Sequence, residues 1–240
     1  MITIASISGG KDSIAMAIEM HKRGEKVDHY IYVDTGVHFP EQEVAIKHLE
    51  ELLGITITRL RFPHSFWHYA VEIEHKKQTH GKRTHGYGIP SWRNRWCTSV
   101  KLVVIRRFIR ETLKLKKGEC VHLIGIAADE PKRLKPREDA RYPLAEYGIT
   151  EARALEICRE NGIFMPGESF YDHASRLSCF CCPFTRVKAA VALYKHRPEL
   201  WQYIKDLEKA TGMTWRTDHG TEYYERLAEE DSNGRCNRDS

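Results

Sequence analysis

Residues 1–16 read MITIASISGGKDSIAM, and this stretch decides how the fold begins. The apolar run 2–7 predicts a buried strand, and the apolar periodicity of 13–23 predicts a helix that ends at Gly24. Between them lies a glycine-rich turn, Ser8-Gly9-Gly10-Lys11-Asp12-Ser13. Because backbone N–H groups in such a turn converge with a helix N-terminus, the arrangement is typical of an anion site.

This turn matches neither of two common phosphate loops. A Walker loop needs glycine where the chain has Ala5 and serine or threonine where it has Asp12, and the dinucleotide fingerprint needs spaced rather than adjacent glycines. We therefore predict another kind of anion site, in which Ser8 and Ser13 donate from their hydroxyls and Lys11 contacts phosphate directly. Asp12 would cap the helix or hold a cation. The alternative without a ligand is a plain helix cap at Asp12 or Ser13.

The rest of the chain continues the alternation of strands and helices. Apolar runs predict strands at 27–33, 55–60 and 120–127, and periodic segments predict helices at 40–53, 99–115, 150–161, 186–196 and 198–211. Such alternation, with continuous apolar strands, predicts a parallel sheet covered on both faces. We expect a nucleotide-binding α/β domain at 1–150, a cysteine-containing helical extension at 151–228 and a flexible tail at 229–240.

Composition limits the classes of function. The chain has 240 residues, 41% hydrophobic content and a net charge of +5, which suits an anionic substrate and is too weak to require a nucleic acid. The sequence shows neither a membrane span nor the layout of an export signal, so we expect a cytoplasmic protein. Seven cysteines in such a chain favour metal ligation, catalysis or burial over a disulfide framework.

Polar residues follow two further predicted strands. Asp34-Thr35-Gly36 ends the second strand, and Gly125, Glu130 and Arg133 come at or after the end of the fourth. Ligands of open parallel sheets bind beyond the carboxyl ends of the strands. Asp34 there can accept from ribose hydroxyls or hold Mg²⁺, and Gly125 lets an adenine approach closely. The alternatives are a β-turn at Asp34 and a solvated charged loop after the fourth strand.

The remaining candidate residues are cysteines and the cations beside them. Cys97 lies between Arg95 and Lys101, which can bind an anion or lower the pKa of the thiol; the alternative is a basic surface loop. Cys179 and Cys182 form a C-x-x-C turn with Cys181 inside it. Such a turn aims two sulfurs at one point, which suits Zn²⁺ or an iron–sulfur cluster, with a redox dithiol as the rival.

Several of these motifs resemble those of the phosphoadenosine phosphosulfate (PAPS) reductase family. SGGKDS looks like the PP-loop, SGGxDS, of the adenine-nucleotide alpha-hydrolase superfamily, and DTGVHFPE resembles DTG-x-x-FPE. RWCTSVK resembles R-x-CT-x-x-x-K, with one residue fewer before its lysine. The resemblance runs from Ser8 to Pro183 and implies a doubly wound, mainly parallel, Rossmann-like fold of the HUP type. It departs at Ala127 and Ala128, where the family pattern has an arginine.

The resemblance also implies roles for individual residues. It implies catalytic roles for Lys11 and Asp12, and a site for an adenine nucleotide, ATP or PAPS, with Mg²⁺ as a companion. That site comprises Ser8, Gly9, Gly10, Lys11, Asp12, Ser13, Asp34, Thr35, Gly36, Arg95, Lys101, Gly125, Glu130 and Arg133. It joins Cys97 to Cys179 and Cys182, with Cys181 or Cys158 as a fourth ligand, and favours a [4Fe–4S] cluster over zinc.

Three functions follow from this resemblance. In a sulfonucleotide reductase, Cys236 would attack the sulfonate and a thiol carrier would complete the cycle, although the ECG-[IL]-H motif of such enzymes is absent around Cys236. In an ATP-dependent adenylyl or sulfur transferase, pyrophosphate would leave on the PP-loop and a nucleic acid or small molecule would be the acceptor. A nucleotide-binding subunit without catalysis is the third. We expect no membrane partner and consider a homodimer.

Overall fold

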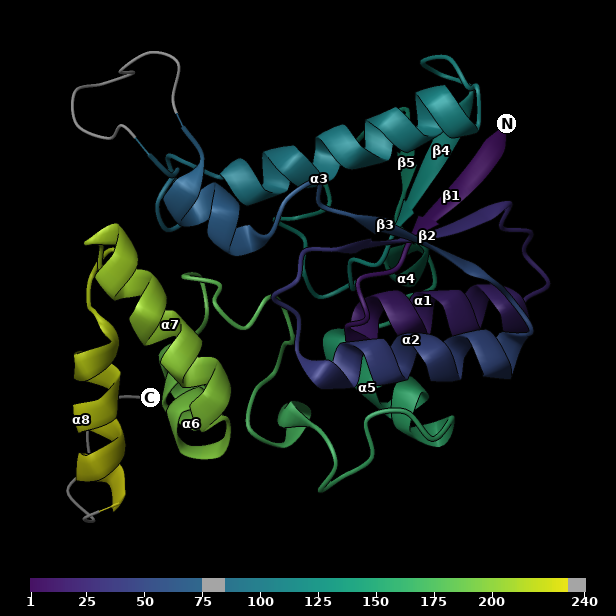
Figure 1. Ribbon diagram of the computed structural model, residues 1–240. Helices are drawn as coiled ribbons and strands as arrows, with labels where there is room; N and C mark the ends of the chain where they lie inside the picture. The colour runs from purple at the N-terminus through teal and green to yellow at the C-terminus, as the bar shows by residue number, and fades with distance from the viewer. Residues whose placement is uncertain (75–84, 233–240) are drawn as a thin grey trace.

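The centre of the protein is a parallel sheet of five strands (Figure 1). The computed structural model describes residues 1–74 and 85–232. The strand order is β3-β2-β1-β4-β5, so the first strand lies in the middle of the sheet. The strands are β1 (Ile2–Ser6), β2 (His29–Asp34), β3 (Ile57–Arg61), β4 (Cys120–Ile124) and β5 (Ala140–Arg141). Because all of them are parallel, the turns after β1, β2 and β4 meet at one rim.

Helices cover both faces of this sheet, which confirms the doubly wound Rossmann-like fold (Figure 1). Ile4 and Ile31 pack on one face against Phe108 and Ile109, whereas Ala5 belongs to the larger core on the other face. The alternation follows from side chains pointing to opposite faces along a strand. The first face carries α3 (Trp96–Arg107) and a π-helical turn (Phe108–Thr112), and the second carries α1 (Lys11–Lys22), α2 (Pro40–Leu53), α4 (Pro143–Glu146) and α5 (Glu151–Glu160).

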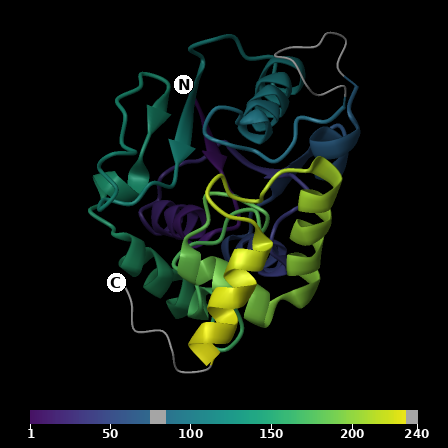
Figure 2. The same cartoon turned by 90° about the vertical axis from the view of Figure 1, so that its left-hand side faces the viewer.

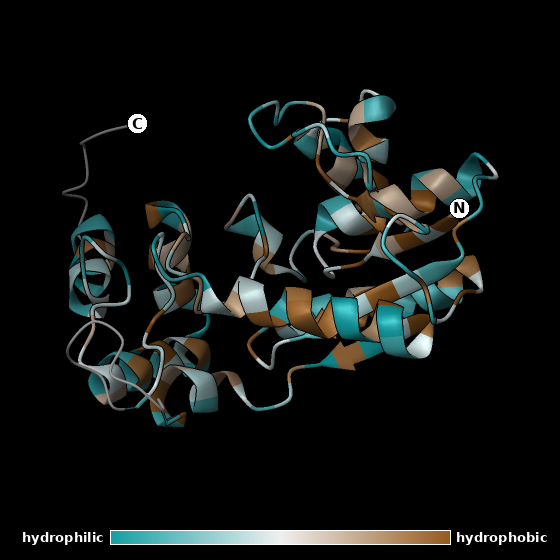
Figure 3. Ribbon diagram, turned by 90° about the horizontal axis from the view of Figure 1, so that it is seen from above, coloured by the Kyte–Doolittle hydropathy of each residue, from teal (hydrophilic) through white to brown (hydrophobic). Residues whose placement is uncertain are grey.

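A group of C-terminal helices lies beside the sheet (Figures 1 and 2). It consists of α6 (Val187–His196), α7 (Pro198–Thr211) and α8 (Thr221–Ser232), and a 3₁₀ turn (Phe170–Asp172) precedes it. Viewed from above, the helices carry hydrophobic and hydrophilic bands, as helices with one buried side do (Figure 3). Helix α7 lies against a π-helical turn (His68–Glu72), with the rings of Trp67 and Tyr203 5.9 Å apart. No helix in the described parts of the chain is long and apolar enough to span a membrane.

Several sequence predictions need correction. The second strand starts at His29 rather than at 27, and the predicted helix 99–115 starts at Trp96, which puts Cys97 in its first turn rather than in a loop. Helix α8 continues to Ser232 and so includes the first four residues of the tail expected from 229, while 233–240 lies outside the described residues. By contrast, α2 has the predicted bounds, and Thr150 caps α5 by accepting from the Arg153 N–H at 3.2 Å.

Candidate nucleotide and thiol site

The glycine turn is a close-packed junction between β1 and α1. Gly9 has φ +75°, and a Cβ there would lie 2.8 Å from the Cβ of Gln42 and 2.9 Å from its carbonyl oxygen. The Gln42 amide donates to the Ser8 carbonyl oxygen at 2.9 Å, so α2 fixes the turn from behind. A Cβ on Gly125, at the end of β4, would lie 2.8 Å from the Asp12 carbonyl oxygen. Gly125 therefore lets the end of β4 approach the start of α1, and the adenine contact that the sequence suggested stays a prediction.

Two serines and a tyrosine hold the turn in shape. The Ser8 N–H donates to the Ser13 hydroxyl oxygen at 3.0 Å, and that hydroxyl donates to the Gly10 carbonyl oxygen at 2.9 Å. The Lys11 N–H donates to the Tyr171 hydroxyl oxygen at 2.7 Å. The cap residue of α1 is Gly10, which has no side chain to cap with, so neither Asp12 nor Ser13 is the N-cap. The N-terminus of α1, which is the positive end of the helix dipole, therefore faces the rim of the sheet without a side-chain cap.

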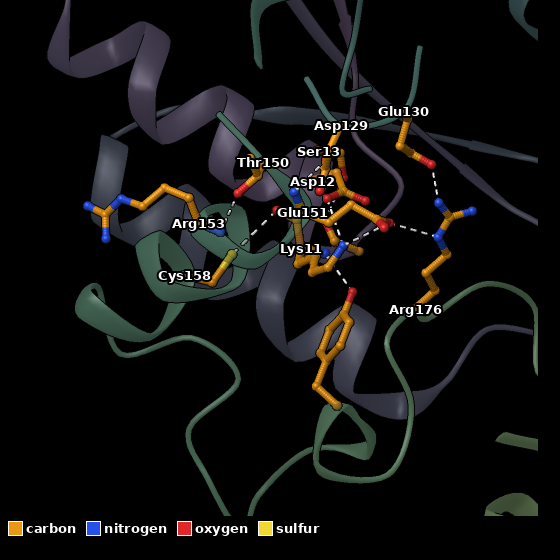
Figure 4. A network of polar contacts seen from close by, with 12 residues as sticks. Lys11, Asp12, Ser13, Asp129, Glu130, Thr150, Glu151, Arg153, Cys158 and Arg176 are labelled. Carbon is orange, nitrogen blue, oxygen red and sulfur yellow. Dashed lines mark hydrogen bonds and ion pairs between the residues drawn. The ribbon is translucent and has the colours of Figure 1, made fainter. Parts of the chain in front are cut away.

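Lys11 is turned towards carboxylates (Figure 4). Its side chain is buried, and its Nζ lies 2.8 Å from Asp12 and 3.4 Å from Glu151. Burial raises the pKa of Asp12 although the Lys11 ammonium opposes that shift. In this arrangement Lys11 neutralises two acids, and its direct contact with phosphate stays a prediction.

A cavity of about 330 Å³ opens in front of the turn, and we call it the loop pocket. Its size is within the range of small-molecule sites. Among the predicted residues it is lined by Ser8, Gly10, Asp12, Ser13, Gly125, Arg133 and Cys182. Three more residues of its wall, Tyr171, Arg176 and Arg186, come from the C-terminal part of the chain and were not among the candidates. No short motif surrounds these arginines, so only the fold brings them to the turn.

A second cavity, of about 320 Å³, adjoins the first, and we call it the thiol pocket. Its wall contains seven predicted residues, Thr35, Arg95, Cys97, Lys101, Cys179, Cys181 and Cys182, and one that was not predicted, His38. The guanidinium of Arg95 lies over the rings of Trp92 and Phe184, 4.7 and 5.1 Å from their centroids. The two cavities share five lining residues, Ser8, Leu177, Ser178, Cys182 and Phe184. The predicted anion turn and the predicted cysteines therefore line two adjoining cavities.

His38 and Thr35 organise the thiol of Cys179. The Thr35 hydroxyl lies 3.6 Å from the Cys179 sulfur and 3.4 Å from His38 Nε2, and His38 Nδ1 lies 2.6 Å from the Tyr32 hydroxyl. Burial opposes ionisation of Cys179, but the charge of Lys101 and hydrogen bonding from His38 and Thr35 outweigh it and lower the pKa to about 6. His38 was missed, although it stands in the quoted stretch DTGVHFPE, four residues after Asp34.

The pKa values of the neighbouring thiols are raised instead of lowered. Burial raises the pKa of Cys182 to about 11, and burial and the nearby Cys179 also raise the pKa of Cys97. Cys181 is buried, and its pKa lies well above the usual value. Cys179 is therefore the thiol of the pocket that ionises most easily.

The four cysteines do not form a ligand set as they are arranged here. Among the described residues, no three His, Cys, Asp or Glu side chains come together in a way that would hold a metal ion. The chemistry of four thiols suits an iron–sulfur cluster or zinc, but their placement does not fit either group. Cys158, the other candidate ligand, is buried, and its sulfur donates to the Lys11 carbonyl oxygen at 3.4 Å.

Other predicted residues lie outside the walls of both cavities. Asp34 accepts from the Gly36 N–H at 2.8 Å, the geometry of the turn that was its alternative role, and lies 3.8 Å from His38 Nδ1. Glu130 is buried, where Arg133 donates to it at 2.6–2.8 Å. Gly9 belongs to the turn but is packed against Gln42 rather than lining a cavity. Cys236 lies outside the described residues.

The parallel sheet, the glycine turn at its rim and the cavity in front of that turn define a nucleotide-binding α/β protein of the PP-loop type. A comparison with protein-family models agrees: residues 2–138 match the phosphoadenosine phosphosulfate reductase domain. The chain belongs to this family, in the PP-loop superfamily. The matched range contains the glycine turn, Cys97 and Arg133, and it ends before Arg176 and the later cysteines.

Two curated relatives are similar to the chain, and neither has a described activity. It is 25% identical over 211 residues to the uncharacterized protein MJ0066 of Methanocaldococcus jannaschii, covering 83% of this chain and 40% of that protein. It is 29% identical over 166 residues to the uncharacterized nin region protein ORF290 of Escherichia phage lambda, covering 63% of this chain and 56% of that protein. The chain thus spans about half the length of these relatives.

Proposed function

We propose that this chain is an enzyme that binds an adenine nucleotide by its phosphate end in the loop pocket and carries out sulfur transfer with a thiol of the adjoining pocket. The observation that carries the proposal is the shared wall of the two cavities. Ser8 of the glycine turn and Cys182 of the cysteine cluster line both of them. A phosphate or sulfonate bound at the turn would lie next to the thiols, as group transfer between them requires.

The residues of the loop pocket suit a highly charged phosphate group. Arg133 and Arg186 supply guanidinium charge, and the N-terminus of α1 supplies the positive end of a helix dipole. Asp12 also lines this pocket, and its carboxylate, although paired with Lys11, would oppose the binding of a bare anion. Mg²⁺ is usually held by one or two carboxylates together with substrate phosphates, so Asp12 fits a magnesium ion that arrives with the nucleotide. Such an ion would offset charge on a leaving pyrophosphate. This feature favours ATP over PAPS.

In the thiol pocket, the chain's own residues would prepare Cys179. His38 can take the proton of that thiol, and Lys101 balances the charge of the thiolate. Arg95 and Lys101 would orient an anionic acceptor or donor of sulfur. A [4Fe–4S] cluster or zinc at Cys97, Cys179, Cys181 and Cys182 stays a prediction of the sequence resemblance, which metal analysis of anaerobically purified protein tests.

Calorimetry with ATP and with PAPS, each with and without Mg²⁺, tests the proposal. We expect ATP to bind with magnesium and PAPS to bind more weakly. Pyrophosphate release in the presence of a sulfur donor and candidate acceptors would then support an ATP-cleaving transferase, whereas sulfite release from PAPS would support a reductase. A protein that binds neither nucleotide contradicts the proposal, and nucleotide binding without turnover would assign it to a binding subunit.

A further inference from the structure

Arg176 lies on the wall of the loop pocket and forms ion pairs with two acidic side chains (Figure 4). Its Nε donates to Glu151 at 2.8 Å, and an Nη donates to Glu130. Glu151 begins α5 and Glu130 follows β4, so the arginine joins two separate parts of the sheet region. The residue itself stands beyond the range of the family match.

The two acids fix the guanidinium without using all of its hydrogen-bond donors. A guanidinium has five N–H donors in a rigid plane. The contacts with Glu130 and Glu151 use two of the guanidinium nitrogens, and the arginine side chain, which lines the cavity, is 43% exposed. Glu130, by contrast, is only 6% exposed, so its position is set by the core. A planar fork held by a buried acid is preorganised for bidentate contact with phosphate oxygens.

Charge balance shows why the pocket depends on this arginine. Asp12, Glu130 and Glu151 pair with Lys11, Arg133 and Arg176, so three acids face three cations, and Glu130 and Glu151 are the two that hold Arg176. Removing Arg176 would leave both carboxylates beside the glycine turn with less positive charge to offset them. The pocket would then lose a group that attracts phosphate, and its two carboxylates would repel phosphate more strongly. Charges a few ångströms apart interact strongly near a protein surface.

We propose that Arg176 binds the phosphate end of the nucleotide in the loop pocket and that Glu130 and Glu151 hold its guanidinium in position to do so. This inference rests on the proposed function, because it names a further binding residue of the same site. It assigns part of that site to the region after residue 138, outside the family domain.

Calorimetry on Arg176→Ala tests the assignment, with ATP, inorganic pyrophosphate and adenosine as probes. Loss of one charge-assisted contact of this kind is expected to weaken ATP and pyrophosphate binding by about tenfold or more. Adenosine binding should be unchanged, since the arginine would face the phosphates. Arg153→Ala is the matched control, because Arg153 lies in the same helix as Glu151 but pairs with Glu156 and Glu160 at the surface. Its affinity for ATP should stay within about twofold of the wild-type value.

The outcomes separate this inference from the proposed function. A wild-type chain that binds no adenine nucleotide contradicts both. Wild-type binding together with equal ATP affinity in Arg176→Ala overturns the assignment alone, as does an equal loss for adenosine, which would indicate a structural role. Should the alanine variant not fold, Arg176→Lys keeps the positive charge but not the planar guanidinium, and it must still lose pyrophosphate affinity.

Discussion

The backbones of His38 and Cys179 form an isolated antiparallel bridge, which joins the turn after β2 to the cysteine cluster. The Phe180 N–H donates to the Val37 carbonyl oxygen at 3.0 Å in the same pairing. A residue 141 positions further along the chain than His38 is thereby placed beside Thr35. The pairing explains why Cys179, which lies in a loop, has His38 as a fixed neighbour.

Cys179 should be the most reactive thiol of the pocket at neutral pH. Its lowered pKa of about 6 means that the thiolate prevails above that pH, while Cys182, with a pKa of about 11, remains protonated. Because only the thiolate reacts, brief iodoacetamide treatment followed by peptide mass mapping should find Cys179 modified first. The rate should be nearly constant from pH 8 to pH 7 and fall as the pH drops through about 6.

His38→Gln should slow this reaction, because it removes a hydrogen bond and a charge that stabilise the thiolate. A rise of one pKa unit lowers the thiolate fraction by about fivefold at a pH equal to the original pKa, and by about tenfold at a pH well below it. His21→Gln, at an exposed position near the end of α1, is the control and should react like the wild type. Equal labelling of Cys179 and Cys182 at pH 7 would contradict the prediction.

Because Gly9 lies so close to Gln42, replacing it should lower the free energy of unfolding more than replacing another glycine with positive φ. Gly9→Ala and Gly24→Ala both place a side chain at similar φ, +75° and +68°, but only the first meets Gln42, while the second meets nothing within 4 Å. We expect Gly9→Ala to cost about 1–3 kcal/mol more than Gly24→Ala in the free energy of unfolding, through overpacking. Urea denaturation of the two variants measures the difference, and equal losses would refute the close approach.

Local sequence patterns were enough to predict four of the five strands, the glycine turn and the rim at which the candidate residues meet, but not the two-residue strand β5. The apolar runs and the Pro40 start of α2 are determined by neighbouring residues, so the pattern reads them directly. The direction of the Lys11 side chain depends instead on Glu151, which is 140 residues away. Arg176 and Arg186 are brought to the pocket by the path of the C-terminal segment. Such tertiary placements leave no periodicity or motif in a single sequence.

Lys11 should matter for stability, because its ammonium is buried between two acids. Removing one partner of a buried ion pair leaves uncompensated charge and costs roughly 3 kcal/mol or more. Lys11→Met should therefore lower the free energy of unfolding by about this amount at pH 7, since Asp12 and Glu151 would then repel each other. Lys26→Met is the matched control: its side chain is 85% exposed in a pair with Asp28, so we expect a change of less than about 1 kcal/mol. Similar changes in the two variants would show that the Lys11 pairs contribute little.

The hydroxyl of Tyr224 is expected to be dispensable, in contrast to the indole of its neighbour Trp215. Tyr224 is fully buried, and among the described residues its hydroxyl has no hydrogen-bond partner, whereas Trp215 donates to the Cys181 carbonyl oxygen at 2.9 Å. Tyr224→Phe keeps the ring, 5.8 Å from that of Trp215, and removes a polar group buried without compensation. It should leave the free energy of unfolding unchanged or raise it by up to about 1 kcal/mol.

Trp215→Phe should instead lower the free energy of unfolding by about 2 kcal/mol, because the Cys181 carbonyl oxygen loses its donor. The same change should loosen the cysteine segment and speed iodoacetamide labelling of Cys181, which is 1% exposed in the wild type. Chemical denaturation and peptide mass mapping of both variants measure the two effects. A loss of stability in Tyr224→Phe as large as that in Trp215→Phe would mean that the tyrosine hydroxyl is satisfied, and the contrast drawn between the two residues would be wrong.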